Sequence, residues 1–148
     1  MFSVHLSVLD MSSRSKTVVR AFVAAINAQD WAALERVVSP TFTRHSTAAG
    51  AMGVKSARDL VQYLRQEFVT FPDAVEYIED IFADEDKVAV RHRFRGTQTG
   101  QMGPFPPSGK VMDATYIAIY RVEGDRICEA WVEWDNLAGL RQLGHAPD

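Results

Sequence analysis

Two carboxylates alternate with tryptophans in residues 127–136, ICEAWVEWDN, near the end of the chain. Glu133 and Asp135 are two residues apart, so in a strand both side chains point to the same face. Two carboxylates on one partly desolvated face repel each other, which raises one pKa and creates a candidate general base near neutral pH. The alternative is that one or both form ion pairs with Arg91 or Arg93. The pattern predicts a pocket wall with Glu133 or Asp135 as its base.

Pairing the last two predicted strands, residues 110–122 and 126–136, places further candidates beside these carboxylates. Counting outward from a four-residue hairpin loop pairs Tyr116 with Glu133, and directly opposed residues share a face. Tyr116 is then either a hydrogen-bond donor to a substrate oxygen or a tyrosine that reaches a backbone carbonyl. The expected pocket face carries Met112, Ala114, Tyr116, Ala118, Trp131, Glu133 and Asp135. The opposite face, expected to be a dimer interface or a core, carries Val111, Thr115, Ile117, Ile119, Ala130, Val132 and Trp134.

A second candidate pair lies on an earlier predicted hairpin, whose strands cover residues 74–83 and 87–96. A two-residue turn would place Glu79 opposite His92 on an apolar face. A carboxylate beside a histidine fixes its tautomer and raises its pKa, which suits proton transfer. The alternative is a structural bridge between the two side chains.

The other face of this hairpin is expected to be solvated. The same count pairs Asp80 with Arg91 and Glu76 with Arg95, as cross-strand ion pairs. His45, the last residue of a short strand predicted at residues 41–45, is expected to face the same cavity as the candidate base.

Three helices are predicted ahead of the hairpins, at residues 14–28, 31–38 and 56–69, because apolar residues recur there at helical spacing. From residue 74 the apolar period changes to two, which is typical of strands. Helices followed by a run of strands indicate an α+β fold with the helices on one face of a bent sheet. The space that the helices leave uncovered is the expected cavity.

The remaining segments are a loop and the two ends of the chain. Residues 97–109 are rich in glycine and proline and too long for a tight hairpin, so this loop is expected to cover the cavity. A final helical turn is expected at residues 137–143. Residues 1–12 alternate apolar and polar side chains and are interpreted as an N-terminal extension, either a short strand or frayed, ahead of a single domain at residues 13–148.

Composition excludes several classes of protein. The chain has 148 residues, 47% of them hydrophobic, and a net charge of −3, so no basic field favours nucleic acid or an anionic membrane. No apolar run is long enough to span a bilayer, and we expect a cytoplasmic protein. The lone Cys128 excludes an intrachain disulfide and a cysteine-based metal cluster. The histidines lack metal-ligand spacing, which leaves a site made by His45, His92 and a carboxylate as the alternative.

Three segments resemble the SnoaL-like polyketide cyclases, also called the ester cyclase family, of the nuclear transport factor two-like superfamily. They are FVAAINAQDWAALERVVSPTFTRH, RFRGTQTGQMGPFPPSGK and YRVEGDRICEAWVEWDNLAGLRQLG. The resemblance implies a cone-shaped α+β barrel, in which a strongly curved antiparallel (mixed) sheet and three N-terminal helices enclose a cavity. It also implies a homodimer formed through the sheet, and an intramolecular aldol cyclisation driven by a pocket aspartate without cofactor or metal.

Two positions connect this chain to the family pattern, and one departs from it. Asp135 in VEWDN matches the family's C-terminal aspartate, and His45 matches a histidine common after the second helix. Many relatives read Glu-His-Trp where this chain has Glu129-Ala130-Trp131, so a histidine used in those relatives is missing here.

The residues support three hypotheses. The first is a cofactor-free acid/base enzyme, of cyclase, isomerase or hydrolase type, acting on a small, largely apolar carbonyl or ester compound. Its catalytic residues would be Asp135, Glu133, His92 and His45, and its substrate contacts Tyr116, Trp131, Glu79 and Met112. The second is a protein that binds a hydrophobic small molecule without turnover. The third is a dimeric interaction module whose cavity is filled by side chains.

Overall fold

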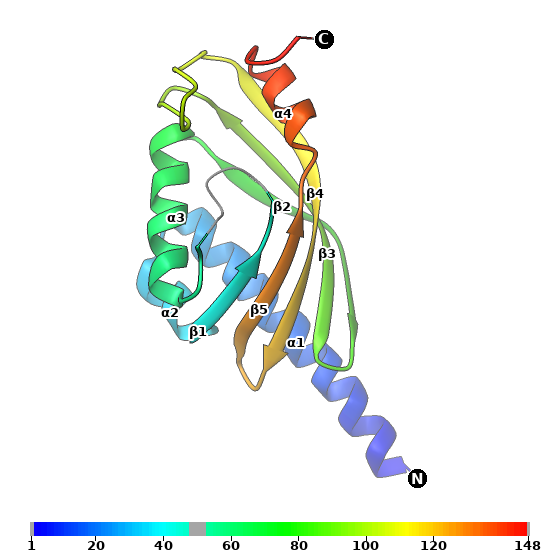
Figure 1. Ribbon diagram of the computed structural model, residues 1–148. Helices are drawn as coiled ribbons and strands as arrows, with labels where there is room; N and C mark the ends of the chain where they lie inside the picture. The colour runs from blue at the N-terminus through cyan, green and yellow to red at the C-terminus, as the bar shows by residue number, and fades with distance from the viewer. Residues whose placement is uncertain (1, 48–52, 148) are drawn as a thin grey trace.

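The computed structural model describes residues 2–47 and 53–147 and has one curled, five-stranded sheet with helices on its concave face (Figure 1). The strand order is β1-β5-β4-β3-β2; β1 runs parallel to β5, and the other neighbours are antiparallel. The predicted α+β fold with a curved mixed sheet is confirmed. The sheet is curled but does not close into a barrel. The elements are α1 (Phe2–Ala28), α2 (Trp31–Val37), β1 (Val38–His45), α3 (Ala57–Thr70), β2 (Val75–Asp84), β3 (Lys87–Thr97), β4 (Val111–Glu123), β5 (Arg126–Glu133) and α4 (Asn136–Gln142).

Local sequence accounts for where α2 and α3 begin. The Asp30 side chain accepts a hydrogen bond from the backbone N–H of Ala33 at 3.0 Å, and Ser56 accepts one from Asp59 at the same distance. Such N-caps satisfy backbone donors that have no partner within the helix. No helix among the described residues is long and apolar enough to cross a membrane.

Helix α1 is longer than the sequence predicts. It begins at Phe2, not at residue 14, so the segment interpreted as a strand or a frayed extension is helical. Adding residues to an existing helix costs less than starting a new element, and no glycine or proline interrupts this stretch. The N-terminal turns project beyond the sheet in Figure 1. Residue 1 lies outside the described ranges.

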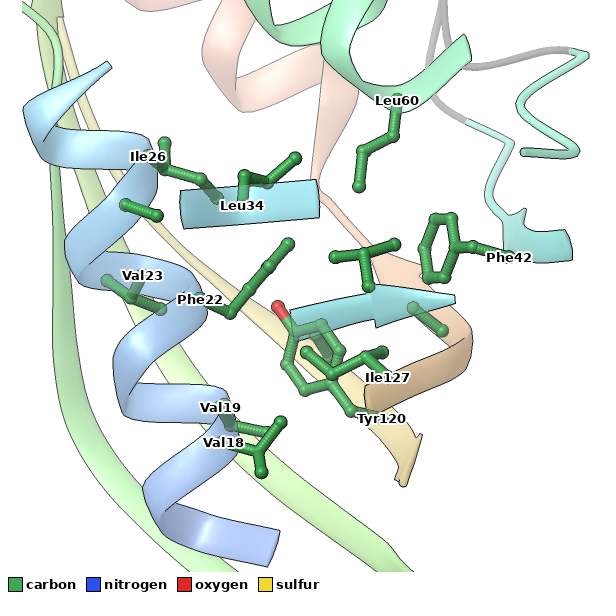
Figure 2. Packing of buried hydrophobic residues seen from close by; sticks show 14 of the residues in the cluster. Val18, Val19, Phe22, Val23, Ile26, Leu34, Phe42, Leu60, Tyr120 and Ile127 are labelled. Atoms are coloured by element: carbon green, nitrogen blue, oxygen red, sulfur yellow. The ribbon is translucent and has the colours of Figure 1, made fainter. Parts of the chain in front are cut away.

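The core lies between the helices and the concave face of the sheet (Figure 2). The predicted apolar stripe of α1 is buried, and it faces side chains from α2, β1, α3, β4 and β5. The residues labelled in Figure 2 are Val18, Val19, Phe22, Val23, Ile26, Leu34, Phe42, Leu60, Tyr120 and Ile127. This packing leaves one end of the concave face for the cavity described below.

A bulge in β5 changes which of its residues face the core. Val122 pairs with Ile127, but the register then shifts by one residue, with Cys128 as the extra residue. An extra residue moves every side chain beyond it to the other face. Trp131 therefore pairs with Ile119 and Glu133 pairs with Ile117, and all four lie on the outer face of the sheet.

The predicted faces of β5 are therefore wrong, whereas those of β4 are right. Ala130, Val132 and Trp134 face the interior in place of Trp131 and Glu133, and they meet Tyr116 and Ala118 of β4 there.

Strand β2 contains a second bulge, at Glu79. The predicted ion pair between Asp80 and Arg91 is confirmed, with 2.6 Å between the Arg91 Nη2 and Asp80 Oδ2 atoms. Beyond it the register shifts, so His92 lies opposite Ile78 and not opposite Glu79, which is exposed. Glu76 is opposite Phe94 and not Arg95, and it is buried. The predicted Glu79–His92 and Glu76–Arg95 pairs are both wrong.

Candidate active site

Two adjoining hollows lie between α3 and the concave face of the sheet. The outer chamber has a volume of about 500 Å³ and is lined by α3, α4, the segment between β3 and β4, and the ends of the strands. The inner chamber, of about 50 Å³, lies deeper, between α1, α3 and the sheet. Tyr63, Glu67 and Trp134 line both chambers, so they form the boundary between them.

The outer chamber is mainly apolar. Phe71, Phe94 and Phe105 contribute aromatic rings, and Met102 and Met112 contribute thioethers. A cavity of this size with aromatic walls is typical of small-molecule sites. The loop predicted to cover the cavity does line it, through Met102, Gly103, Pro104 and Phe105.

The inner chamber combines apolar walls with a buried polar cluster. Phe22, Ile26, Phe42, Leu60 and Tyr120, all labelled in Figure 2, form part of its wall. Its polar lining side chains come from β1, α3, β2 and β4 and are Arg44, Tyr63, Glu67, Glu76, Tyr116 and Tyr120. Polar groups are rarely gathered in a core without a role, because burying them is costly.

Glu76 is held by hydrogen bonds to both its backbone and its side chain. Its backbone N–H donates to the Asn27 side-chain oxygen at 2.8 Å, and its carbonyl accepts from the Asn27 amide at 2.9 Å. The Tyr116 hydroxyl donates to the Glu76 Oε2 atom at 2.9 Å. Burial raises the pKa of Glu76 well above its usual range, and the charge of Glu67 adds to this effect, whereas Tyr116 and Arg44 oppose it. Burial therefore favours the protonated form of Glu76 over its charged form.

Glu67 lies on α3 and is half-buried at the boundary of the two chambers. Burial raises the pKa of this carboxyl to about 7, and the positive charge of Arg44 opposes the shift. A carboxyl with this pKa is partly ionised at neutral pH and can both accept and return a proton.

Arg44 supplies the positive charge of the cluster. Its guanidinium lies over the Tyr63 ring, 4.8 Å from the ring centroid. The Nη1 atom is buried and has no hydrogen-bond partner among the described residues. An unpartnered buried donor lining a cavity is suited to bind a ligand oxygen.

His92 lies behind this cluster. It is 1% exposed, stacks on Tyr116 with 4.6 Å between ring centroids, and its Nε2 atom is hydrogen-bonded to the Tyr120 hydroxyl at 2.8 Å. Its Nδ1 atom is 3.9 Å from the Glu76 Oε2 atom, too far for a hydrogen bond. Burial lowers the pKa of His92 to about 4, so the ring is neutral. The expectation of a raised histidine pKa is wrong, because burial outweighs any nearby carboxylate.

The model of the SnoaL-like polyketide cyclase family matches residues 16–143. The chain belongs to this family. No curated protein matches it significantly.

Solved structures of similar fold support the assignment to the SnoaL-like family. IdmH, a candidate polyketide cyclase from Streptomyces antibioticus, is 25% identical over 88% of this chain and 98% of its own, with a TM-score of 0.78. TsrD from Streptomyces laurentii is 25% identical over 90% and 97%, with a TM-score of 0.80. AclR, a candidate hydroxylase from Streptomyces galilaeus, is 25% identical over 93% and 89%, with a TM-score of 0.78.

Five residues predicted for the site of this SnoaL-like protein line neither chamber, and two of them, Glu79 and His92, are described above. Glu133 is exposed on the outer face. His45 stacks on Trp131 with 5.4 Å between centroids, and its Nε2 atom is 2.7 Å from the Glu129 Oε2 atom. The prediction that Trp131, Glu133 and His45 face the cavity is therefore wrong.

The three remaining predicted residues do line a chamber. Asp135 and Met112 line the outer chamber, and Tyr116 lines the inner one. The Asp135 carboxylate accepts a hydrogen bond from the Ala138 N–H at 3.0 Å and so caps α4. Ala130 also lines the inner chamber.

Sequence reasoning missed Arg44, Tyr63, Glu67 and Glu76. One signal was present for Glu67, which is three residues after the buried Leu64 and so lies beside the apolar stripe of α3. A carboxylate at the edge of a buried stripe is a candidate for a perturbed pKa. Glu76 carried no such signal, because its face depends on the bulge at Glu79. Among the side chains described, those of residues 10–47 and 53–147, no three histidine, cysteine or carboxylate groups could together hold a metal ion.

Proposed function

We propose that this cavity catalyses cofactor-free proton transfer on a small, largely apolar carbonyl compound, with Glu67 as the general base. The observation that carries the proposal is that the Glu67 carboxyl, with a pKa of about 7, lines both chambers beside the protonated Glu76. Two carboxyls whose environments place them in different protonation states are suited to act as a base and an acid.

The roles follow from protonation states and position. The ionised Glu67 removes a proton from the carbon next to the carbonyl, and the C–H electron pair forms the enol double bond. The carbonyl oxygen takes a proton from Glu76, whose resulting charge is stabilised by the Tyr116 hydroxyl. The positive charge of Arg44 stabilises the oxygen while negative charge develops on it.

A cyclisation uses the same groups in a second step. The enol carbon attacks a second carbonyl of the same molecule and forms a C–C bond. Glu67 then gives its proton to the new alkoxide, and Glu76 recovers the enol proton, so both carboxyls return to their starting states. The family name and the candidate cyclase IdmH support this class of reaction. Asp135 is assigned a contact at the cavity mouth and not the role of base.

Hydrogen–deuterium exchange of a simple bicyclic ketone tests the base directly. We expect the protein to accelerate exchange of the α-protons of 1-tetralone in D₂O at about pH 7.5, measured by mass spectrometry. Glu67→Gln should lower the enzymatic rate by about a hundred-fold or more, because a positioned general base contributes about 10²–10⁴-fold.

Glu133→Gln is the matched control, since the same substitution is made on the outer face. It should leave the exchange rate unchanged. Equal rates for Glu67→Gln and the unsubstituted protein would reject Glu67 as the base. Bound ketone with no exchange above the buffer rate would favour the alternative, a small-molecule-binding protein without turnover.

A further inference from the structure

We infer that ligands bind with an oxygen-bearing head group in the inner chamber and an apolar body in the outer chamber, and that Ala130 sets the largest head group accepted. The assignment of the head as a carbonyl rests on the proposed function. The division into two parts, and the role of Ala130, rest on the chambers themselves.

The volumes of the two chambers determine which part of a ligand each chamber can hold. A cavity needs about 10–15 Å³ on this measure to hold one water molecule, so a space of about 50 Å³ holds only a group of a few atoms. The outer chamber, at about 500 Å³, lies within the range of cavities that hold whole small molecules. The inner chamber can therefore hold only a small terminal group beyond the boundary formed by Tyr63, Glu67 and Trp134.

The chemistry of the chamber walls sets the orientation in which a ligand binds. An apolar body fits the aromatic and thioether walls around Phe71, Phe94 and Met112. In the inner chamber, an apolar group would leave Arg44 Nη1 without a partner, at a cost of about 1–3 kcal/mol for a buried donor. A ligand that binds head-first satisfies this donor.

The charges of the inner chamber favour a neutral head over a carboxylate. Arg44 is positive, and Glu67 gains its negative charge as pH rises through about 7. Glu76 and the buried hydroxyls of Tyr63, Tyr116 and Tyr120 stay protonated, because burial raises the pKa of each. His92, behind them on β3, is neutral, and the α1 residues of the wall are apolar. A carboxylate head would therefore be repelled by Glu67 above pH 7, whereas a ketone would not.

Ala130 controls the space available to the head. It is 1% exposed on β5 and contributes only a methyl group to the inner wall. Ala130→Val adds two methyl groups within a chamber that holds only a few atoms. Ala118 on β4 is the matched control, because it is equally buried but does not line either chamber.

The test uses naphthalene, 2-acetylnaphthalene and 2-naphthoate as probes, with Kd measured by isothermal titration calorimetry at about pH 8. We expect the unsubstituted protein to bind the ketone about ten-fold more tightly than naphthalene, because a site with buried donors discriminates against a ligand without an acceptor. The naphthoate should bind more weakly than the ketone. Ala130→Val should abolish the ketone preference while the Kd of naphthalene changes by less than about two-fold, and Ala118→Val should retain the preference.

Two outcomes would overturn the inference. One is equal binding of the ketone and naphthalene by the unsubstituted protein, and the other is an unchanged preference in Ala130→Val. If Ala130→Val does not fold, as judged by circular dichroism, Ile26→Val enlarges the same chamber by one methylene. It should improve binding of 2-propionylnaphthalene relative to 2-acetylnaphthalene by several-fold, and no change would also reject the inference.

The experiments distinguish a failure of the binding inference from a failure of the proposed catalysis. A ketone preference that depends on Ala130, without α-proton exchange, would retain the inference and reject the proposed catalysis. Exchange that depends on Glu67, with no effect of Ala130→Val on ketone binding, would retain the catalysis and reject the inference.

Discussion

Glu67 and Glu76 are close enough that the charge on one affects the other. Burial is the larger cause of both raised pKa values, and the charge of Glu67 raises the pKa of Glu76 further. Two coupled carboxyls titrate as a pair. Near neutral pH the pair therefore carries at most about one negative charge, which the positive charge of Arg44 opposes. The protein keeps this arrangement by fixing the Glu76 backbone with Asn27.

The raised pKa of Glu67 makes stability depend on pH. Between the usual pKa of 4.5 and the folded value of about 7, the folded state binds more protons than the unfolded state. The free energy of unfolding should therefore fall as pH rises through this window, and Glu76 adds a change of the same sign. Urea denaturation at pH 4.5, 6 and 7.5 measures the slope.

Glu67→Gln should flatten this dependence and raise stability at pH 7.5, because it removes a carboxyl that is ionised more easily in the unfolded state. Glu133→Gln should leave the slope as it is. A steeper loss of stability in Glu67→Gln would contradict the assigned pKa. In the exchange assay, the same ionisation should appear as a rise in rate with a midpoint near pH 7.

At the scale of elements, the two bulges decide which side chains reach the cavity. The extra residue in β2 precedes the Asp80–Arg91 pair and places Glu76 inside, and the extra residue in β5 places Ala130 and Val132 inside. Bulges of this kind are common beside functional sites because they re-aim side chains.

The segment between β3 and β4 depends on one buried side chain. Gln98 is fully buried, and its amide donates to the carbonyls of Gly100 and Pro106, each at 3.1 Å. Its side-chain oxygen accepts a hydrogen bond from Ser108 and is 2.7 Å from the His145 Nε2 atom. Gln98 therefore joins both ends of the loop to the C-terminal segment, and the loop carries Met102 and Phe105 into the outer chamber.

Gln98→Ala should lower the free energy of unfolding by about 2 kcal/mol or more, because each buried group left unpaired costs about 1–3 kcal/mol. It should also weaken naphthalene binding several-fold through loss of the outer wall. Gln101→Ala, an exposed position in the same loop, should change stability by less than about 0.5 kcal/mol. Equal effects of the two substitutions in urea denaturation would show that Gln98 does not anchor the loop.

At the scale of the whole molecule, the outer face of the sheet is the surface on which the dimer prediction rests. Exposed apolar side chains lie on β2 and β4 there, namely Val75, Tyr77, Val111, Ile117 and Ile119. They are interspersed with ion pairs, including Arg93 with Asp113 at 2.7 Å. A mixed apolar and charged surface of this kind is suited to self-association. The dimer stays a prediction.

Sedimentation equilibrium tests it. We expect a mass of about 33 kDa, twice the 16.5 kDa of the chain. Ile119→Glu should shift the protein to the monomer mass, because a charge would be buried in the interface. Val69→Glu, an exposed position on α3 away from this face, should keep the dimer. A monomer mass for the unsubstituted protein would reject the prediction.

The sequence by itself determined the family and the types and order of the elements from residue 14 onward. The apolar periods of α1 and α3, the caps at Asp30 and Ser56, and the alternation in β3 and β4 arise from neighbouring residues, so they can be read locally. The same holds for the loop over the cavity and for Tyr116, which lies on an unbulged strand.

Only the tertiary structure decided which acids face the cavity. The residues around Glu79 and Cys128 do not indicate a bulge locally. The register of each strand pair depends on packing between strands and helices that are distant in the chain. Each bulge reverses the faces beyond it, so Glu133 moved to the outer face and Glu76 moved inside. The pKa values of Glu67 and His92 also depend on the tertiary structure, because burial is a property of the assembled core and not of the sequence around each residue.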